Sequence, residues 1–330
     1  MNIYDISQKS GVSIATVSRV INSKPGVSEK TRQKVLAVMD EIAYTPNVFA
    51  RNLGGTQSIM TIGILCKDVV DPYLSTAVTT VERELRLRGY DSFLSCTGDS
   101  LEGRKKNLQM LLSKRVDAVI LIGSHFINDN VDYIKQVAMT IPVILINGHI
   151  EATNIYSILC DDHAATIATT DYFIKKGYRN ILYLYDTLTY SGIQKLTGYK
   201  QALSQNAIPY NEELTLQVSG SLSEMATMLG DYISTAPTFD AVIAAHDMLA
   251  IAMLKACTKC NLSIPEDIEL ISYNNSMLAT CSTPELSTVD SRVEALCMTA
   301  VTTLFGVLEG KNFPEKTIIS GSIVFRDTTK

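Results

Sequence analysis

From Thr61 onward, short apolar runs alternate with amphipathic stretches of helical length. This alternation predicts an α/β fold with parallel, doubly wound sheets. The expected strands form a first series (IGILC, DSFLSC, AVILIG, VILIN, SILCD) and a second (ILYLY, LTLQV, AVIAAH, IELISY). Helices are expected near 74–88, 101–114, 129–139, 164–176, 192–206, 223–234 and 247–260. Two similar α/β halves in tandem predict a bilobed clamp.

Polar and aromatic residues follow most of these strands. In open parallel sheets, ligands gather beyond the carboxyl ends of the strands. The residues found there are Lys67, Asp68, Asp71, Tyr73, Ser124, His125, Gly148, His149, Asp162, His163, Asp186, His246, Asp247, Asn274 and Asn275. Together they suit a hydroxyl-rich ligand, with an aromatic ring to stack on a sugar. A residue of this kind taken alone is more often a solvated loop or capping residue, so the prediction depends on their convergence.

The stretch Ser7–Asn22, SQKSGVSIATVSRVIN, predicts a helix, a tight turn at Gly11 and a second helix capped by Ser13. The spacing puts Ile6, Val12, Val17 and Ile21 on the buried side and leaves Thr16, Ser18, Arg19 and Asn22 facing outward. A second helix with this outer face is the geometry that enters the DNA major groove. A plain amphipathic helix pair could show the same pattern.

A third helix is expected from a cap at Ser28 to about Ala43, with Val35, Met39 and Ile42 packing on the first two. Amides and hydroxyls at its start, with Thr31, can take phosphate oxygens. The following TPNVFARNLGG could form one or two helical turns before Gly54 and Gly55. So short a helix is marginal alone, because nucleation is costly, and could fold only against a partner or on DNA.

Charge is divided unevenly along the 330 residues. The net charge is −5, but residues 1–60 hold seven Lys/Arg against four Asp/Glu, and residues 61–330 hold 22 against 30. The basic share therefore accompanies the suspected DNA-reading helix. No apolar run resembles a signal peptide or a membrane span, so we expect a cytoplasmic protein that does not interact with membranes. The seven scattered cysteines suggest reduced thiols.

The segments GVSIATVSRVIN, VSEKTRQKVLAVMDEIAYTPN and ARNL closely resemble the headpiece of the lactose-repressor (LacI/GalR) family of bacterial transcription regulators. The resemblance implies an all-α helix-turn-helix headpiece and a hinge helix, followed by a periplasmic-binding-protein-like body. It also implies a homodimeric, allosteric regulator, most often a repressor, that binds pseudo-palindromic double-stranded operator DNA. The DNA-binding residues would be Ser13, Ile14, Ala15, Thr16, Ser18, Arg19, Asn22, Ser28, Thr31, Tyr44, Asn47, Arg51 and Leu53, the last as a minor-groove wedge.

The body shows the same resemblance, with departures. DPYL resembles the family's NPFF, KLTGY its RxxGF/Y, AHD its AND, and SYNNS its G(Y/F)DD. The implied effector-binding residues are Asp71, Tyr73, His125, Asp161, Lys195, His246 and Asn274. Lysine in place of arginine gives up a bidentate fork, and asparagine in place of aspartate gives up a charged acceptor. SYNNS is similar to the maltose-type regulators of Gram-positive bacteria, which points to a mono- or oligosaccharide.

The segment STPELSTVDSRVEAL resembles the family's crossover between lobes, and TIISGSIVFRDTT its closing strands. We therefore expect a DNA-binding domain at 1–45, a hinge and linker at 46–60, and an effector-binding and dimerisation domain at 61–330. Within the last, one subdomain would comprise about 61–160 plus 292–318, and the other about 161–290 plus 319–330.

Two other classes of protein fit parts of the sequence. An α/β enzyme is disfavoured because the chain has no GxGxxG, GxxxxGK[ST], GxSxG or HExxH, so we expect no catalytic residue, metal or cofactor. The CxxC at Cys257 and Cys260 could be a redox or zinc site, but without a second CxxC or CxxH nearby a packed or dimer face is favoured. A sugar-binding transport protein would fit the body alone but not the headpiece.

Overall fold

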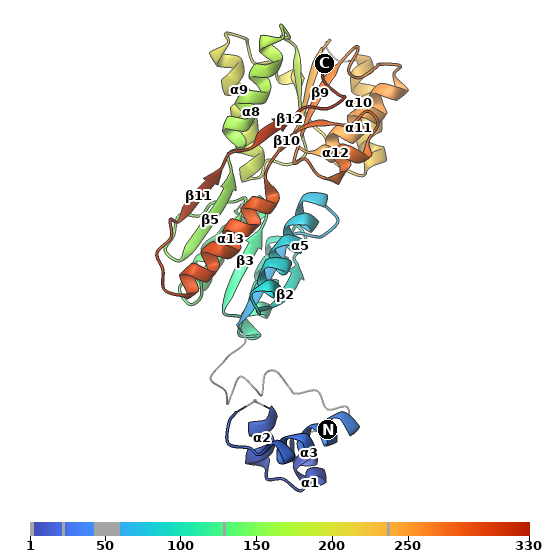
Figure 1. The fold of residues 1–330 in the computed structure, drawn as a ribbon. Coiled ribbons are helices and arrows are strands. Elements are labelled where there is room, and N and C mark those ends of the chain that lie inside the picture. The colour runs from blue at the N-terminus through green and yellow to red at the C-terminus, as the bar shows by residue number, and fades with distance from the viewer. Residues whose placement is uncertain (1–2, 22–23, 43–59, 128–129, 236–237) are drawn as a thin grey trace. The chain divides into compact units, whose positions relative to one another are not determined.

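The computed structural model describes residues 3–21, 24–42, 60–127, 130–235 and 238–330. The chain divides into two units, residues 1–60 and 61–330, each with a core of its own (Figure 1). In the described ranges, no helix combines the length and the apolar character that crossing a membrane requires.

In the first unit, the described residues form three short helices around a small apolar core. They are α1 (Ile3–Ser10), α2 (Ile14–Ile21) and α3 (Glu29–Glu41). Ile6, Val17, Val20 and Val35 are at most 3% exposed and form this core. The turn between α1 and α2 is made by Gly11 at a φ of +61°, a conformation that costs a residue without Cβ little. The helix, turn and helix expected from the sequence are therefore present.

The second unit has two lobes, and the first is a six-stranded parallel sheet in the order β11-β5-β4-β3-β1-β2. Helices α5 and α13 pack together over one face, whereas α6 and α7 supply the apolar residues that cover the other. The elements are β1 (Thr61–Cys66), α5 (Pro72–Leu87), β2 (Asp91–Cys96), α6 (Leu101–Ser113), β3 (Ala118–Ile122), a 3-10 turn η1 (Ser124–Ile127), α7 (Asp132–Ala138), β4 (Val143–Ile146), β5 (Ile155–Cys160), α13 (Val293–Leu308) and β11 (Lys316–Ile319).

The second lobe repeats this plan with strand order β12-β10-β9-β8-β6-β7. Helix α8 packs against α9, and α10 packs against α11 (Figure 1). The elements are α8 (Asp162–Lys175), β6 (Ile181–Tyr185), α9 (Tyr190–Gln205), η2 (Glu212–Leu214), β7 (Thr215–Gln217), α10 (Leu222–Thr235), β8 (Ala241–Ala244), α11 (Asp247–Lys259), β9 (Glu269–Tyr273), α12 (Met277–Cys281), β10 (Ser287–Asp290) and β12 (Ser322–Val324).

The chain passes between the lobes three times, after β5, after β10 and after β11. Because β10 leads out of the second lobe and β12 leads back into it, β12 pairs with β10 in the antiparallel direction. The second sheet is therefore mixed rather than purely parallel. The three crossings meet at Gly321, where an added Cβ would lie 3.0 Å from the Asp290 carbonyl oxygen and 3.3 Å from Cys160 Sγ.

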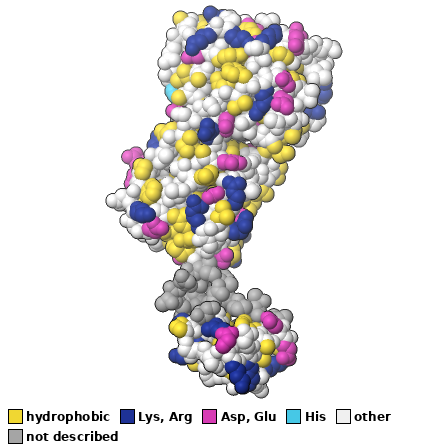
Figure 2. Space-filling view, viewed as in Figure 1, with side chains coloured by type: hydrophobic (Ala, Val, Ile, Leu, Met, Phe, Trp, Pro, Cys, Tyr) yellow, Lys and Arg dark blue, Asp and Glu magenta, His cyan; other side chains and the backbone are white. Residues whose placement is uncertain are grey.

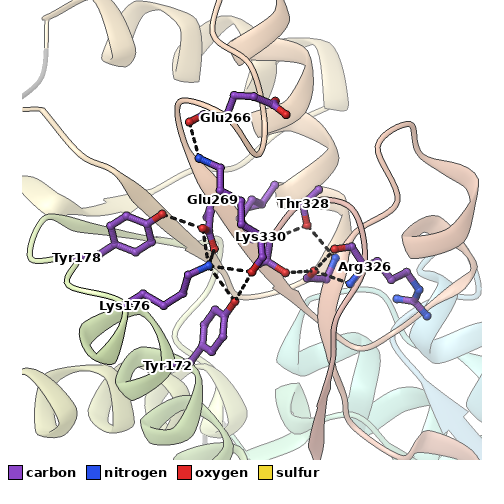
Figure 3. A network of polar contacts seen from close by, with 11 residues as sticks. Tyr172, Lys176, Tyr178, Glu266, Glu269, Arg326, Thr328 and Lys330 are labelled. Carbon is purple, nitrogen blue, oxygen red and sulfur yellow. Dashed lines mark hydrogen bonds and ion pairs between the residues drawn. The ribbon is translucent and has the colours of Figure 1, made fainter.

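Residues 326–330 are fastened to the second lobe by a polar network around Glu269, which is fully buried (Figure 3). Its carboxylate accepts a 2.6 Å hydrogen bond from Lys176 Nζ and a 2.7 Å bond from the Tyr178 hydroxyl. Lys176 also donates to the carbonyl oxygen of Lys330, at 2.9 Å. Burial and the contact with Glu269 raise the pKa of Tyr178 to about 12, so this hydroxyl remains a donor. The network joins α8, β9 and residues 326–330.

Candidate functional site

Helix α2 presents the residues that the sequence assigns to base contacts. Val17 and Val20 are buried, whereas the Ser13, Ala15 and Arg19 side chains are exposed and Ile14 is 42% exposed. Thr16 and Ser18 are half-buried. Ser13 caps the helix as expected, because its Oγ accepts a hydrogen bond from the Thr16 amide at 3.3 Å. Helix α2 is therefore amphipathic, as its sequence predicts, and its exposed face can approach a DNA groove.

The start of α3 offers a second polar surface in the same unit. Ser28 is its N-cap and accepts from the Thr31 amide, and the two hydroxyl oxygens lie 2.8 Å apart. Both residues thus stand at a helix N-terminus, where free amides favour phosphate oxygens. The remaining residues assigned to DNA lie outside the described residues: Asn22, Tyr44, Asn47, Arg51 and Leu53.

Between the lobes of the second unit lies a cavity of about 360 Å³. It is lined from both lobes by residues in the loops and helices that follow the carboxyl ends of strands: Lys67, Asp71, Tyr73, Leu74, Asp99, Arg104, Gly123, Ser124, His125, Asn147, Asp186, Thr187, Thr189, Ser191, Gly192, Lys195, Ala245, His246 and Asn274. These residues cluster around β1 and β3 in one sheet and β6 and β8 in the other, where the strand order reverses. Such reversals form the crevice that binds ligands in open α/β sheets.

Six of the seven predicted effector residues line this cavity, and Asp161 does not. The Asp161 carboxylate instead caps α8 by accepting a hydrogen bond from the Ala164 amide at 3.0 Å. The next residue, Asp162, is buried behind the wall, where Ser191 donates to it at 2.5 Å. Burial raises the pKa of Asp162 despite the opposing effects of Lys195 and Ser191. Asp161 is therefore the N-cap of α8 and does not line the cavity.

Lys195 reaches the cavity from α9 and is 7% exposed. Its Nζ donates to the Ala245 carbonyl oxygen at 3.0 Å and lies 4.2 Å from the centroid of the Tyr273 ring. A carbonyl and an aromatic face both stabilise an ammonium that is partly removed from water. The lysine is thus held in a defined position in the second lobe.

Asp186 and His246 face each other in the second lobe, with Asp186 Oδ2 3.4 Å from His246 Nε2. Burial opposes ionisation of Asp186. The effect of burial is outweighed by the hydrogen bond and charge of His246 and by amide donors such as Thr187. Together these lower the pKa of Asp186 to about 2. The carboxylate is therefore ionised at neutral pH. In the first lobe, Lys67 Nζ and Asp99 Oδ1 form an ion pair of 2.8 Å.

Three neutral polar groups in the first lobe's wall have no hydrogen-bond partner among the described residues: Tyr73 hydroxyl, His125 Nε2 and Asn147 Oδ1. Burial, with the nearby charges of Arg104 and Lys67, lowers the pKa of His125 to about 4, so its imidazole is neutral. Gly123, at a φ of +110°, leaves room for that ring, because a Cβ there would lie 2.9 Å from His125 Nδ1. Buried polar atoms left unpaired are costly unless something binds to them.

Sequence reasoning missed Asp99, Arg104, Asn147, Thr189 and Ser191. Asp99 could have been found, because it follows the DSFLSC strand just as Asp71 follows IGILC. The VILIN pattern places Asn147 in a strand, but β4 ends at Ile146 and Asn147 has a φ of +61°. Arg104, Thr189 and Ser191 are brought to the cavity by the first turns or caps of helices, which strand periodicity does not reveal.

Cys257 and Cys260 lie on α11 and at its end. Cys257 is 1% exposed in the second-lobe core, and Cys260 Sγ lies 3.7 Å from the Gly230 carbonyl oxygen. Within the described ranges, no group of three or more His, Cys, Asp or Glu side chains is arranged to hold a metal ion.

Residues 2–47 match the bacterial regulatory proteins of the lacI family, and residues 170–329 match the periplasmic binding protein-like domain. An HTH-type transcriptional regulator of Lachnoclostridium phytofermentans is 48% identical over 332 residues, which cover 100% of this chain and 99% of that protein. The chain belongs to the lacI family.

Two further proteins are similar to this chain over most of its length. Catabolite control protein A of Priestia megaterium is 27% identical over 292 residues, which cover 88% of this chain and 87% of that protein. The lac repressor dimer bound to operator and the anti-inducer ONPF has a TM-score of 0.87 and 25% identity, and covers 100% of this chain and 99% of that chain. This LacI-family protein is a DNA-binding transcription regulator, and the family and fold class predicted from its sequence are confirmed.

Proposed function

We propose that this LacI-family regulator is a repressor whose operator affinity is set by a neutral, hydroxyl-rich ligand bound between the two lobes. The observation that supports it best is the cavity of about 360 Å³, into which polar side chains from both lobes converge. Tyr73, His125 and Asn147 each bring an unpaired polar atom to its wall. Sugar hydroxyls, which both donate and accept, would satisfy all three.

Protein groups already contact several charged side chains of the cavity. Lys67 forms an ion pair with Asp99, Asp186 lies 3.4 Å from His246 Nε2, and Lys195 donates to the Ala245 carbonyl oxygen. A ligand with a net charge would have to displace one of these contacts, which is costly, whereas a neutral ligand would not. We therefore propose a mono- or oligosaccharide, and the SYNNS motif, which is similar to that of maltose-type regulators, favours an oligosaccharide.

The headpiece residues Ser13, Ile14, Ala15, Thr16, Ser18 and Arg19 are proposed to contact the operator, with Ser28 and Thr31 on its phosphates. The lac repressor dimer, which has the same fold, is bound to operator, and this supports a homodimer on a pseudo-palindromic site. Tyr44, Asn47, Arg51 and Leu53 are proposed to complete the contact, with Leu53 wedged between base pairs. The regulator then acts in the cytoplasm, where bacterial DNA lies.

The three crossings between lobes supply a route from ligand to DNA. They let one lobe close on the other around a ligand without the lobes separating. A ligand that binds the closed body more tightly than the open one shifts that equilibrium. In a dimer, closure would change how the two headpieces are presented to the operator.

The proposal is tested by selecting operator sequences from random duplex DNA with the full-length protein and then screening sugars by thermal shift and fluorescence anisotropy. We expect one palindromic sequence to be enriched and at least one sugar to change its affinity. No enrichment over random duplex, together with sugar binding, would instead favour a sugar-binding protein. Turnover of a bound sugar would favour an α/β enzyme.

Matched variants separate the two sites. Asn274→Ala should abolish the sugar response and leave operator affinity intact, whereas Gln201→Ala, exposed on α9, should change neither. Arg19→Ala should relax base preference by about 1–3 kcal/mol at the contacted position. Leu53→Ala should reduce operator affinity and DNA bending. Unchanged bending would show that Leu53 is not inserted between base pairs.

A further inference from the structure

Two cysteines lie side by side where the first two strands of the first lobe reach the cavity. Cys66 is the last residue of β1 and Cys96 the last of β2, and they are register partners in the parallel ladder. Their sulfur atoms are 4.0 Å apart. Cys66 is buried and Cys96 is exposed. A thiol that an oxidant can reach is therefore in contact with one that is shielded.

The backbone here already has the spacing that a disulfide requires. Neighbouring strands lie roughly 4.8 Å apart, and the Cα atoms of disulfide-bonded residues are usually about 4.4–6.8 Å apart. Only the sulfur atoms would have to move, from 4.0 Å to about 2 Å. Rotation of the exposed Cys96 side chain can supply most of that movement.

The residues that follow this pair connect it to the cavity. The Thr97 amide donates to the Cys66 carbonyl oxygen, and the Gly98 amide donates to that of Lys67, both at 2.9 Å. Lys67 and Asp99 form the ion pair in the cavity wall. A bond between the sulfurs would therefore hold together the two loops that carry this ion pair.

We propose that Cys66 and Cys96 form a reversible disulfide that joins these two loops at the edge of the ligand cavity. Its importance for regulation rests on the proposed function, but its formation needs neither ligand nor DNA. The site would take a two-electron oxidant of the peroxide class.

The chemistry balances with hydrogen peroxide. The Cys96 thiolate attacks one peroxide oxygen, the O–O bond breaks, hydroxide leaves, and Cys96 becomes a sulfenic acid. The Cys66 sulfur then attacks the Cys96 sulfur, the S–O bond breaks, and the S–S bond forms. The hydroxyl group leaves as water with the proton of Cys66. Two thiols have then lost two electrons and two protons, and the peroxide has become two waters.

The environments of the two thiols set the order of these steps. Burial, then the neighbouring Cys96, raises the pKa of Cys66 to about 12, so Cys66 is protonated at neutral pH and the exposed Cys96 is the thiol that reacts with peroxide first. Both steps need a thiolate, so a higher pH should accelerate disulfide formation.

The test treats full-length protein with hydrogen peroxide, with and without later dithiothreitol. We expect an intact mass lower by about 2 Da and a linked peptide containing Cys66 and Cys96, both reversed by dithiothreitol, while the protein remains a monomer band on non-reducing gels. Cys96→Ser should lose the mass change and the linked peptide, whereas Cys281→Ser, an exposed cysteine elsewhere, should retain both. Cys66→Ala should leave Cys96 to oxidise further, to the sulfinic acid.

Hydrogen exchange measures the effect on the loops. Oxidation should slow exchange in peptides covering residues 97–99, in the wild type but not in Cys96→Ser. Three results would each overturn the proposal: a Cys96–Cys96 link between chains, sulfinic acid in the wild type at the rate seen in Cys66→Ala, or a linked peptide without slower exchange. None of these results bears on sugar or operator binding, so the proposed function would stand.

Discussion

The guanidinium of Arg326 donates a 2.7 Å hydrogen bond to the side-chain oxygen of Asn275, the neighbour of the cavity residue Asn274. It also donates to the Leu286 carbonyl oxygen at 2.8 Å. Asn274 and Asn275 have φ angles of +99° and +51°, conformations that are held only when their surroundings fix them. Arg326 is thus a positioning residue for the loop that carries Asn274.

Replacing Arg326 with alanine should weaken sugar binding about tenfold, equivalent to roughly 1.4 kcal/mol, because the loop would no longer be held. Operator affinity without sugar should not change. The measurement is a sugar titration followed by thermal shift. Arg86→Ala, which removes only an exposed ion pair with Glu82, is the control. Equal affinities in both variants would show that Arg326 does not position the loop.

The stability of the body should depend on pH through His125. Its pKa is lowered from 6.5 to about 4, so between these values the unfolded chain binds a proton that the folded chain does not. The free energy of unfolding should therefore be highest above pH 6.5. It should decrease by about 3 kcal/mol as the pH is lowered to 4. Urea unfolding of the wild type and of His125→Gln across this range measures the effect.

The His125→Gln variant should show a shallower fall in stability with pH, because glutamine does not titrate. His149→Gln is the comparison, since burial also lowers the pKa of His149, which does not line the cavity. A His125→Gln slope equal to that of the wild type would mean that His125 is protonated equally in the folded and unfolded states.

Glu269→Gln should destabilise the second lobe by about 3 kcal/mol, because it leaves Lys176 without the carboxylate it pairs with. Glu266→Gln is a matched control three residues away (Figure 3). The Glu266 side chain is exposed, and only its backbone carbonyl takes part in the network, accepting from Lys330 Nζ. It should change stability by no more than about 0.5 kcal/mol. Chemical denaturation of both proteins would show whether the charge of Glu269 stabilises the second lobe.

Ser28 caps α3 and is proposed to contact an operator phosphate, and two substitutions distinguish these roles. Ser28→Ala removes the cap of α3 and should cost the headpiece about 1 kcal/mol of stability. Ser28→Asp should restore that stability, since aspartate also caps helices, but should weaken operator binding because its charge repels phosphate. Thermal unfolding and anisotropy measure the two effects. If Ser28→Asp bound the operator as the wild type does, Ser28 would not contact a phosphate.

The sequence was most informative where periodicity and turn chemistry act locally. Gly11, Ser13 and Ser28 occupy the turn and the caps predicted for them, and the buried strands and their helices are found within a few residues of their expected ends. Apolar runs such as AVILI become strands because each is buried on both faces of a parallel sheet.

Features set by distant contacts could not be predicted in this way. The antiparallel direction of β12 depends on where the third crossing re-enters the second lobe. The short helix α12 follows the SYNNS motif and is capped by Ser276, whose amide donates to buried Asp247 on another helix. Asp161 and Asp162 are adjacent in sequence, yet one caps a helix and the other is buried behind the cavity wall. Strand-end position alone could not decide between them.

Chain order also limits how this gene can be rearranged. Helix α13, which covers the first sheet, is encoded after every strand of the second lobe except β12, so neither lobe corresponds to one uninterrupted stretch of codons. A fragment ending at residue 290 would expose the apolar face of the first sheet and would tend to aggregate. The helices of the headpiece form one continuous segment, so recombination could exchange the recognised DNA sequence while the ligand specificity is inherited intact.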